Sequence, residues 1–260
     1  MIFIRLLFVA ILAFPAAATA QQQNVSKQDV VRLLEKLQLE QNNPDALEGL
    51  GFRGEKLDLM LDHGQKLAQN RVILEFMADK LIGAQSGAQP ADALGGLMTP
   101  LLRRGMPYLP IKEQRYFLNV EFTVMQAMNT TNCGRSVKET IAPQVFARSL
   151  AITTARLNAP ALKEYLRVVR KASTTGVSKP KPPRMSEATK ERVLERFATK
   201  LQDKAAEKGL SRAFARADVS LRQLSNREAC QLGLLFVETV LDTTGADQRP
   251  MLQLFWRDFQ

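Results

Sequence analysis

Apolar residues recur every three or four positions along most of the chain, which is the spacing that places them on one face of a helix. This pattern predicts helices at residues 27–41, 55–67, 71–82, 90–104, 111–128, 136–157, 159–171, 186–208, 210–224, 226–244 and 246–259. Gly64 should bend or break the second of these, and Pro143 should kink or restart the one at residues 136–157. In residues 111–128 so little polar surface remains that we expect this helix to be central and buried. No stretch alternates apolar and polar residues as a half-buried strand does. The chain is therefore predicted to be all-α.

Residues typical of helix starts precede three of these segments. Ser26, Ser186 and Ser225 each stand where an N-cap is expected, and a hydroxyl there accepts a hydrogen bond from an unpaired backbone N–H. Glu228 follows Ser225 by three residues, which is the spacing of a capping box. Local sequence therefore supports the helix starts that the periodicity predicts.

The helical pattern is interrupted by residues 173–185, which combine prolines with basic residues. Proline fixes its own backbone and lacks an N–H, so we expect an extended linker there. This linker would separate an N-terminal helical lobe at residues 21–172 from a smaller C-terminal helical lobe at residues 186–260. The predicted architecture is a two-lobed, bundle-like protein with a basic, proline-rich linker between the lobes.

Positive charge is concentrated around this linker. The chain has a formal net charge of +10, and residues 161–184 hold seven cations against one anion, a net of +6. Such charges either bind an anionic surface, at about 1 kcal/mol per cation, or keep the linker soluble and extended by self-repulsion. Six of them are candidates for binding an anionic partner: Arg167, Arg170, Lys171, Lys179, Lys181 and Arg184.

A second basic pattern lies in residues 186–208. Five cations recur there at every fourth residue: Arg192, Arg196, Lys200, Lys204 and Lys208. Acidic residues run beside them, so that six cations face five anions and the segment has a net charge of only +1. We therefore interpret the pattern as a solvated helix face with mixed charges, and not as a binding stripe.

Residues 1–20 have the order of a secretory signal peptide, with one cation, a short apolar run at residues 6–14 and small residues before a polar start. The apolar run is shorter than the roughly 18 to 20 residues that a membrane span needs, and an uncleaved anchor is the alternative interpretation. No later segment is long and apolar enough to span a bilayer. We therefore expect a mature protein that is periplasmic or secreted.

Cys133 and Cys230 are the only cysteines in the chain, and an exported protein meets an oxidising environment. They are predicted to form one disulfide bond across the linker, and the alternative is two buried free thiols. Cys133 falls in residues 129–134, which we interpret as a turn after the helix at residues 111–128.

Few residues suggest catalysis or a bound cofactor. His63 is the only histidine, and one imidazole with Asp58 and Asp62 nearby is a poor transition-metal site, so neither a metal nor a cofactor is expected. The Gly-x-Ser-x-Gly elbow of hydrolases does not occur. Phe197 and Phe214 lie on apolar helix faces, which leaves no stacking platform for nucleic acid.

Glu75 lies in a predicted helix upstream of Gly96-Leu97-Met98-Thr99. These residues resemble the lytic transglycosylases, which cleave peptidoglycan with a glutamate on a helix and carry a Gly-Leu-Met-Gln segment after it. The resemblance implies that Glu75 is the general acid of a peptidoglycan-cleaving enzyme. The sequence departs from the pattern because no serine follows Glu75 and Thr99 replaces the glutamine. From the residues alone, Glu75 is interpreted as an exposed glutamate on a helix.

The sequence favours an exported helical binding protein, either in an assembly of the cell envelope or as a secreted virulence-type factor. Its expected partner is another envelope or host protein, or an anionic surface, and not a nucleic acid. Binding is favoured over catalysis because no catalytic constellation is present. Two alternatives stay open: a peptidoglycan-acting enzyme that uses Glu75, and a periplasmic chaperone whose two lobes hold a client protein.

Overall fold

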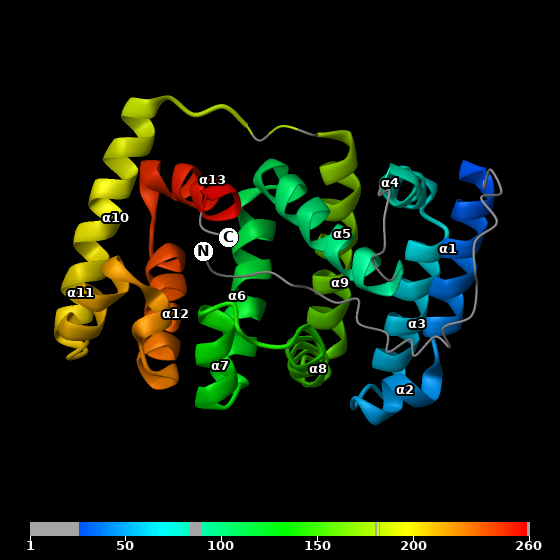
Figure 1. The fold of residues 1–260 in the computed structure, drawn as a ribbon, viewed down its shortest axis with the longest axis horizontal. Coiled ribbons are helices and arrows are strands. Elements are labelled where there is room, and N and C mark those ends of the chain that lie inside the picture. The colour runs from blue at the N-terminus through cyan, green and yellow to red at the C-terminus, as the bar shows by residue number, and fades with distance from the viewer. Residues whose placement is uncertain (1–25, 84–89, 180, 182, 259–260) are drawn as a thin grey trace.

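A computed structural model describes residues 26–83, 90–179, 181 and 183–258, and within them the chain folds into helices (Figure 1). Thirteen α-helices and three short 3-10 helices are present, and none of these residues forms a strand. The predicted all-α fold is therefore confirmed. The predicted signal peptide at residues 1–20 lies outside the described residues. No helix in the described part of the chain is long and apolar enough to cross a membrane.

The helices follow one another with short connections. The α-helices are α1 (Lys27–Gln41), α2 (Pro44–Gly49), α3 (Glu55–Ala68), α4 (Arg71–Gly83), α5 (Pro90–Gly105), α6 (Ile111–Ala127), α7 (Thr130–Val137), α8 (Pro143–Thr154), α9 (Ala159–Ser178), α10 (Glu187–Glu207), α11 (Ser211–Val219), α12 (Asn226–Leu241) and α13 (Gln248–Asp258). The 3-10 helices are η1 (Met106–Tyr108), η2 (Leu221–Gln223) and η3 (Gly245–Asp247). Figure 1 shows α1 to α4 at one end of the molecule, α10 to α12 at the other, and α5, α6 and α9 between them.

The three predicted N-caps are confirmed. The hydroxyls of Ser26, Ser186 and Ser225 each accept a hydrogen bond from the backbone N–H three residues further on. At Ser225 the capping box is complete, because the Glu228 carboxylate accepts a hydrogen bond from the Ser225 N–H at 2.9 Å. Local sequence therefore determines where α1, α10 and α12 begin.

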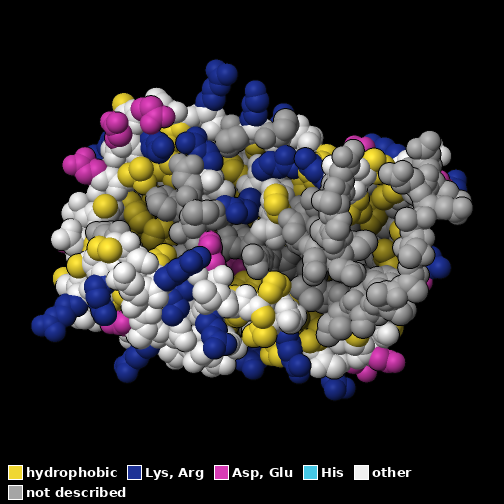
Figure 2. Space-filling view, viewed as in Figure 1, with side chains coloured by type: hydrophobic (Ala, Val, Ile, Leu, Met, Phe, Trp, Pro, Cys, Tyr) yellow, Lys and Arg dark blue, Asp and Glu magenta, His cyan; other side chains and the backbone are white. Residues whose placement is uncertain are grey.

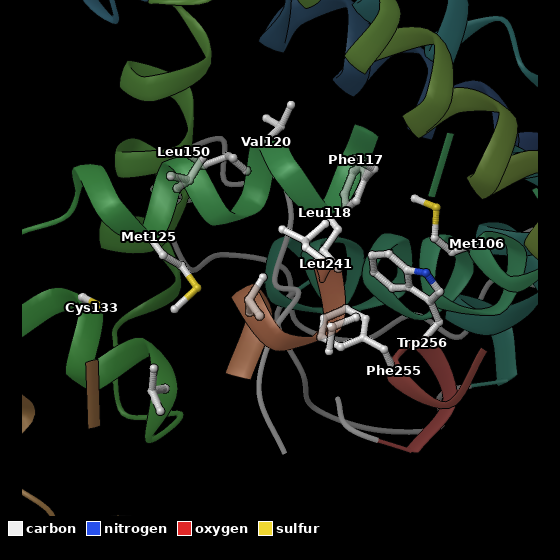
Figure 3. Packing of buried hydrophobic residues seen from close by; sticks show 14 of the residues in the cluster. Met106, Phe117, Leu118, Val120, Met125, Cys133, Leu150, Leu241, Phe255 and Trp256 are labelled. Carbon is white, nitrogen blue, oxygen red and sulfur yellow. The ribbon is translucent and has the colours of Figure 1, made fainter. Parts of the chain in front are cut away.

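Most buried apolar side chains belong to one large core cluster. It includes residues of α6 to α9 and also residues of α10, α12 and α13, beyond the predicted linker. Figure 3 shows Phe255 and Trp256 of α13 beside Leu118 and Phe117 of α6. The ring centroids of Phe117 and Trp256 are 5.7 Å apart, and Phe117 stacks on Tyr165 of α9 at 5.4 Å. The two predicted lobes share this core, and their separation into lobes stays a prediction.

A smaller apolar cluster joins α1, α3, α4 and the C-terminal half of α5. Val177 of α9 packs against it, whereas Val169 and Ala172 of the same helix belong to the large cluster. Helix α9 therefore connects the two clusters. It also carries three of the predicted partner-binding cations.

The start of the linker differs from the prediction, because α9 continues to Ser178 and residues 173–178 are helical. A close contact between α9 and α5 explains the difference. A Cβ on Gly176 would lie 1.9 Å from the carbonyl oxygen of Leu101, so only glycine allows the two backbones to approach so far. This packing stabilises a helix in a stretch of Ser, Thr and Gly, which are poor helix formers by themselves. The observed linker therefore begins at Lys179.

The predicted Cys133–Cys230 disulfide bond is present, with an S–S distance of 2.01 Å and Cα atoms 5.1 Å apart. The prediction that Cys133 lies in a turn is wrong, because this residue lies in α7. The side chain of Asn129 accepts a hydrogen bond from the Asn132 N–H at 2.8 Å and so begins a new helix in this polar stretch. The bond joins α7 to α12 across the linker.

Candidate functional site

Two of the predicted partner-binding cations, Arg167 and Lys171 of α9, are held by one carboxylate. Glu113 of α6 lies 2.6 Å from Arg167 Nη2 and 2.9 Å from Lys171 Nζ. Glu164 also pairs with Arg167, at 2.7 Å. Burial alone would raise the pKa of Glu113, but the hydrogen bonds from Lys171 and Arg167 outweigh this effect and hold the pKa below its ordinary value. Arg167 and Lys171 are therefore neutralised within the fold.

Arg170, the third of these cations on α9, donates a hydrogen bond to Nδ1 of His63 in α3 at 2.8 Å. His63 is buried, and this burial, followed by the charge of Arg170, lowers its pKa to about 3. The imidazole is therefore neutral at physiological pH and accepts the hydrogen bond from the guanidinium. The contact joins α3 to α9, so both side chains take part in the packing of these two helices.

The remaining three cations, Lys179, Lys181 and Arg184, are exposed and lie in the observed linker, which we call the basic strap (residues 179–185). None of the three forms an ion pair with another residue that the structure describes. The strap contains no acidic residue. Figure 1 shows it along one edge of the molecule between α9 and α10, and Figure 2 shows Lys and Arg side chains projecting from this edge. Among the residues that the structure describes, three of the six predicted cations have a charged or histidine partner and three form no ion pair.

The basic strap is attached at both ends and near its middle. The Lys179 N–H donates to a carbonyl of the last turn of α9 at 2.8 Å. The hydroxyl of Tyr108 in η1 donates to the carbonyl of Lys181. Met185 packs against the large core just before α10 begins. The exposed cations therefore extend from a segment whose backbone is held at three points.

The cations that recur along α10 bind to the helices beside it. Four of them form ion pairs with acidic residues at or after the end of α12: Arg192 and Arg196 with Asp247, Lys204 with Glu238 and Asp242, and Lys208 with Glu238. The fifth, Lys200, donates to the backbone carbonyl of Asp242 at 2.8 Å. Arg192, Arg196 and Lys208 are exposed, as expected of a solvated face with mixed charges, and the ion pairs also hold α10 against α12 and η3.

Replacing Lys204 by Met should lower the free energy of unfolding by about 1 kcal/mol at low salt and by less at high salt. The Lys204 ammonium lies 2.5 Å from Asp242 and 3.3 Å from Glu238, and its side chain is only 18% exposed. Met keeps most of the apolar length and removes the charge. Urea denaturation at the two salt concentrations measures the loss.

Lys36→Met is the matched control for this substitution. The Lys36 side chain is 74% exposed and lies 3.8 Å from Glu40, so its removal should change stability little. An equal loss of stability in the two variants would contradict the role of the ion pairs between α10 and α12.

Glu75 forms an ion pair on α4 with Arg71, one turn earlier, at 2.8 Å between Arg71 Nε and Glu75 Oε1. Of the segment that resembles the transglycosylases, Met98 and Thr99 are buried, and the side chains at 96–97 lie outside those that the structure describes. The observed ion pair is typical of a glutamate on a helix surface. A catalytic role of Glu75 stays a prediction.

The sequence analysis did not identify a buried acid in α6. Glu121 is 3% exposed, and the hydroxyl of Tyr165 in α9 donates to its Oε1 at 3.0 Å. Burial raises the pKa of Glu121 to about 8, against the smaller opposite effect of this hydrogen bond. The carboxyl group is therefore mostly protonated at neutral pH. The available signal was its position, since Glu121 follows Phe117 by four residues and precedes Val124 by three in the buried stripe of the helix.

Comparisons with protein-family models, with curated proteins and with solved structures gave no match to this chain. The candidate site is therefore chosen by its geometry alone. The cations on α9 and α10 have partners within the fold, and Glu121 lies in the core. The basic strap combines exposed cations that form no ion pair with a described residue and a backbone attached at Lys179, Lys181 and Met185, which makes it the candidate binding site.

Proposed function

We propose that this chain is an exported helical binding protein, either a member of a cell-envelope assembly or a secreted virulence-type factor. In this proposal the protein docks on an anionic surface through the basic strap. The contrast between the two groups of predicted cations carries the proposal. Those on α9 are bound to Glu113, Glu164 or His63. The strap's three cations form no ion pair among the described residues, so their charge is available to a partner.

Two observations support export. Disulfide bonds persist in the periplasm and outside the cell and are rare in the cytosol, and the bond between Cys133 and Cys230 is buried. Residues 1–20 have the order of charge, apolar run and small residues that a signal peptide has. A basic protein in such a compartment meets anionic headgroups and acidic cell-wall polymers.

The number of cations in the strap favours an extended surface as its partner. Each Lys or Arg close to an anionic membrane contributes about 1 kcal/mol, so the three contribute about 3 kcal/mol. This corresponds to a factor of about 100 in the binding constant, which is too little to hold one small anion tightly. A surface with many closely spaced negative charges compensates, because its high local concentration of partners favours rebinding. An anionic lipid or polymer surface therefore suits the strap better than a single acidic group.

Reversing the three charges of the strap, with Lys179→Glu, Lys181→Glu and Arg184→Glu, should weaken binding to an anionic surface by about 100-fold or more. Sedimentation of the mature protein with vesicles of equal parts phosphatidylglycerol and phosphatidylcholine at low salt measures this loss. High salt should release the wild-type protein, because about 1 M salt shortens the Debye length to about 3 Å.

A matched control reverses three exposed arginines elsewhere, Arg53, Arg148 and Arg156. They lie beside α2 and in or after α8, across the molecule from the strap in Figure 1, and their reversal changes the net charge by the same amount. We expect this control to bind much more strongly than the strap variant. Equal losses in the two variants would show that net charge is responsible and would refute the proposal, as would a wild-type protein that does not bind.

A further inference from the structure

Tyr108 connects the basic strap to the body of the protein. It lies in η1, between α5 and α6, and its hydroxyl donates a hydrogen bond to the carbonyl oxygen of Lys181, 73 residues further along the chain. Tyr108 is 37% exposed, whereas its neighbours Met106 and Leu109 are almost completely buried. It is therefore the side chain by which this buried turn reaches the strap.

The turn provides a rigid base for Tyr108. The Leu109 N–H donates to the Met106 carbonyl at 3.0 Å, and the Leu109 carbonyl accepts a hydrogen bond from the Gln114 side chain at 2.8 Å. Pro107 is also buried, and its ring restricts the backbone. Because burial and hydrogen bonds already hold the turn, the Tyr108 hydroxyl has a defined position relative to the helices.

Few other contacts hold the residues of the strap that the structure describes. Three of its seven residues are prolines, which have no N–H to donate. Lys181 lies between two of them, and the hydrogen bond from Tyr108 holds its backbone about midway between the attachments at Lys179 and Met185. Without this bond, the backbone of Lys181 would regain conformational freedom.

We propose that Tyr108 is the positioning residue of the anionic-surface site, and that its hold on the Lys181 backbone presents the three cations of the strap together. This inference rests on the function proposed above. A strap that is already ordered loses less conformational entropy when it binds, so its affinity rises without any new contact to the surface. Tyr108 acts through the strap and does not need to touch the partner.

The substitution Tyr108→Phe tests the inference because it removes the hydroxyl and keeps the ring. We expect trypsin to cut the Arg184–Met185 bond faster, since a loosened strap enters the protease more readily. Lys179 and Lys181 each precede proline and resist trypsin, so this cut reports on the strap. The binding constant for the same vesicles should fall roughly 2- to 10-fold, the effect of one hydrogen bond. The slope of its logarithm against log salt should not change, because the number of cations is the same.

Tyr116→Phe is the matched control. Tyr116 also donates from its hydroxyl to a backbone carbonyl, that of Ala161, at 2.6 Å, but this contact joins α6 to the start of α9. The control should show wild-type cleavage at Arg184 and wild-type vesicle binding. Circular dichroism checks that both variants are folded.

The possible outcomes separate this inference from the proposed function. Equal cleavage at Arg184 in wild type, Tyr108→Phe and Tyr116→Phe would overturn the positioning role. Unchanged vesicle binding by Tyr108→Phe, where the wild type binds, would also overturn it. Faster cleavage of Tyr108→Phe together with no binding by the wild type would overturn the proposed function and the binding role, and would leave the hold of Tyr108 on the strap as a structural contact.

Discussion

Replacing both Cys133 and Cys230 by Ala should lower the free energy of unfolding by as much as about 4 to 5 kcal/mol. The disulfide joins residues 97 positions apart, and the chain-entropy model assigns about 4.7 kcal/mol to the closure of a loop of about 100 residues. Ala is chosen because both sites are buried and the hydroxyl of a serine there would need a hydrogen-bond partner. The bond also crosses the linker, so its loss removes the covalent connection between α7 and α12.

We expect the loss to be largest in α7, because this helix has little stability of its own. It is eight residues long and contains Thr, Asn, Gly and Ser, which are poor helix formers. It also lies directly on α12: a Cβ on Gly134 would be 2.0 Å from the carbonyl oxygen of Asn226. The disulfide holds this close backbone contact together, so amide hydrogen exchange in residues 130–137 should accelerate more than in α6 when it is absent.

Urea denaturation of the double variant measures the loss in free energy of unfolding, and hydrogen exchange measures the faster exchange in α7. Reduction of the wild-type protein should reproduce them, and reductant should leave the double variant unchanged, which controls for other effects of the reagent. An unfolding midpoint of the wild type that does not move on reduction would contradict the stabilising role of the bond. Uniform acceleration of exchange in α6 and α7 would contradict its local role.

Features for which few alternatives compete could be predicted from the sequence. The capping box of Ser225 and Glu228 needs only residues three positions apart, and its two hydrogen bonds form as expected. The cysteine pair could be predicted because the chain has no other cysteine to offer as a partner. In both cases few alternative partners exist, so the pairing can be predicted without knowledge of the fold.

Features that depend on packing between residues far apart in the chain could not be predicted from the sequence. Residues 173–178 have the composition of a linker, and only the contact of Gly176 with Leu101, 75 positions earlier, explains why they are helical. In the same way, Lys171 and Lys181 are equivalent cations in the sequence. Only the fold brings Glu113 to Lys171 and leaves Lys181 without an ion pair among the described residues.

Replacing Glu121 by Gln should raise the free energy of unfolding at neutral and alkaline pH, by an amount that grows with pH. Burial raises the pKa of this carboxyl group from 4.5 to about 8. Between these values the native protein keeps a proton that the unfolded chain has released, so folding takes up a proton. The free energy of unfolding of the wild type therefore falls by about 1.4 kcal/mol per pH unit from this group. Gln carries no charge at any pH and escapes this loss.

The surroundings of Glu121 support the expected increase in the free energy of unfolding on replacement by Gln. Tyr165 donates the hydrogen bond from α9, and its own pKa is raised well above the ordinary value, first by burial and then by Glu121, so the hydroxyl keeps its proton. The amide oxygen of Gln can accept the same hydrogen bond. No cation among the described residues forms an ion pair with Glu121 that would stabilise its ionised form. The gain from Gln should be absent below about pH 4.5 and level off above about pH 8.

Glu113→Gln, on the same helix, is the matched control with the opposite sign. Hydrogen bonds from Lys171 and Arg167 keep the pKa of Glu113 below its ordinary value in spite of burial. Its ionised form therefore stabilises the native state above the unfolded pKa, and this stabilisation is lost as the pH falls through the lower native pKa. Urea denaturation from about pH 5 to about pH 9 should show Glu121→Gln above the wild type and Glu113→Gln below it. Parallel profiles of Glu121→Gln and the wild type would show that Glu121 is ionised in the native protein, and would contradict its assignment as a protonated core residue.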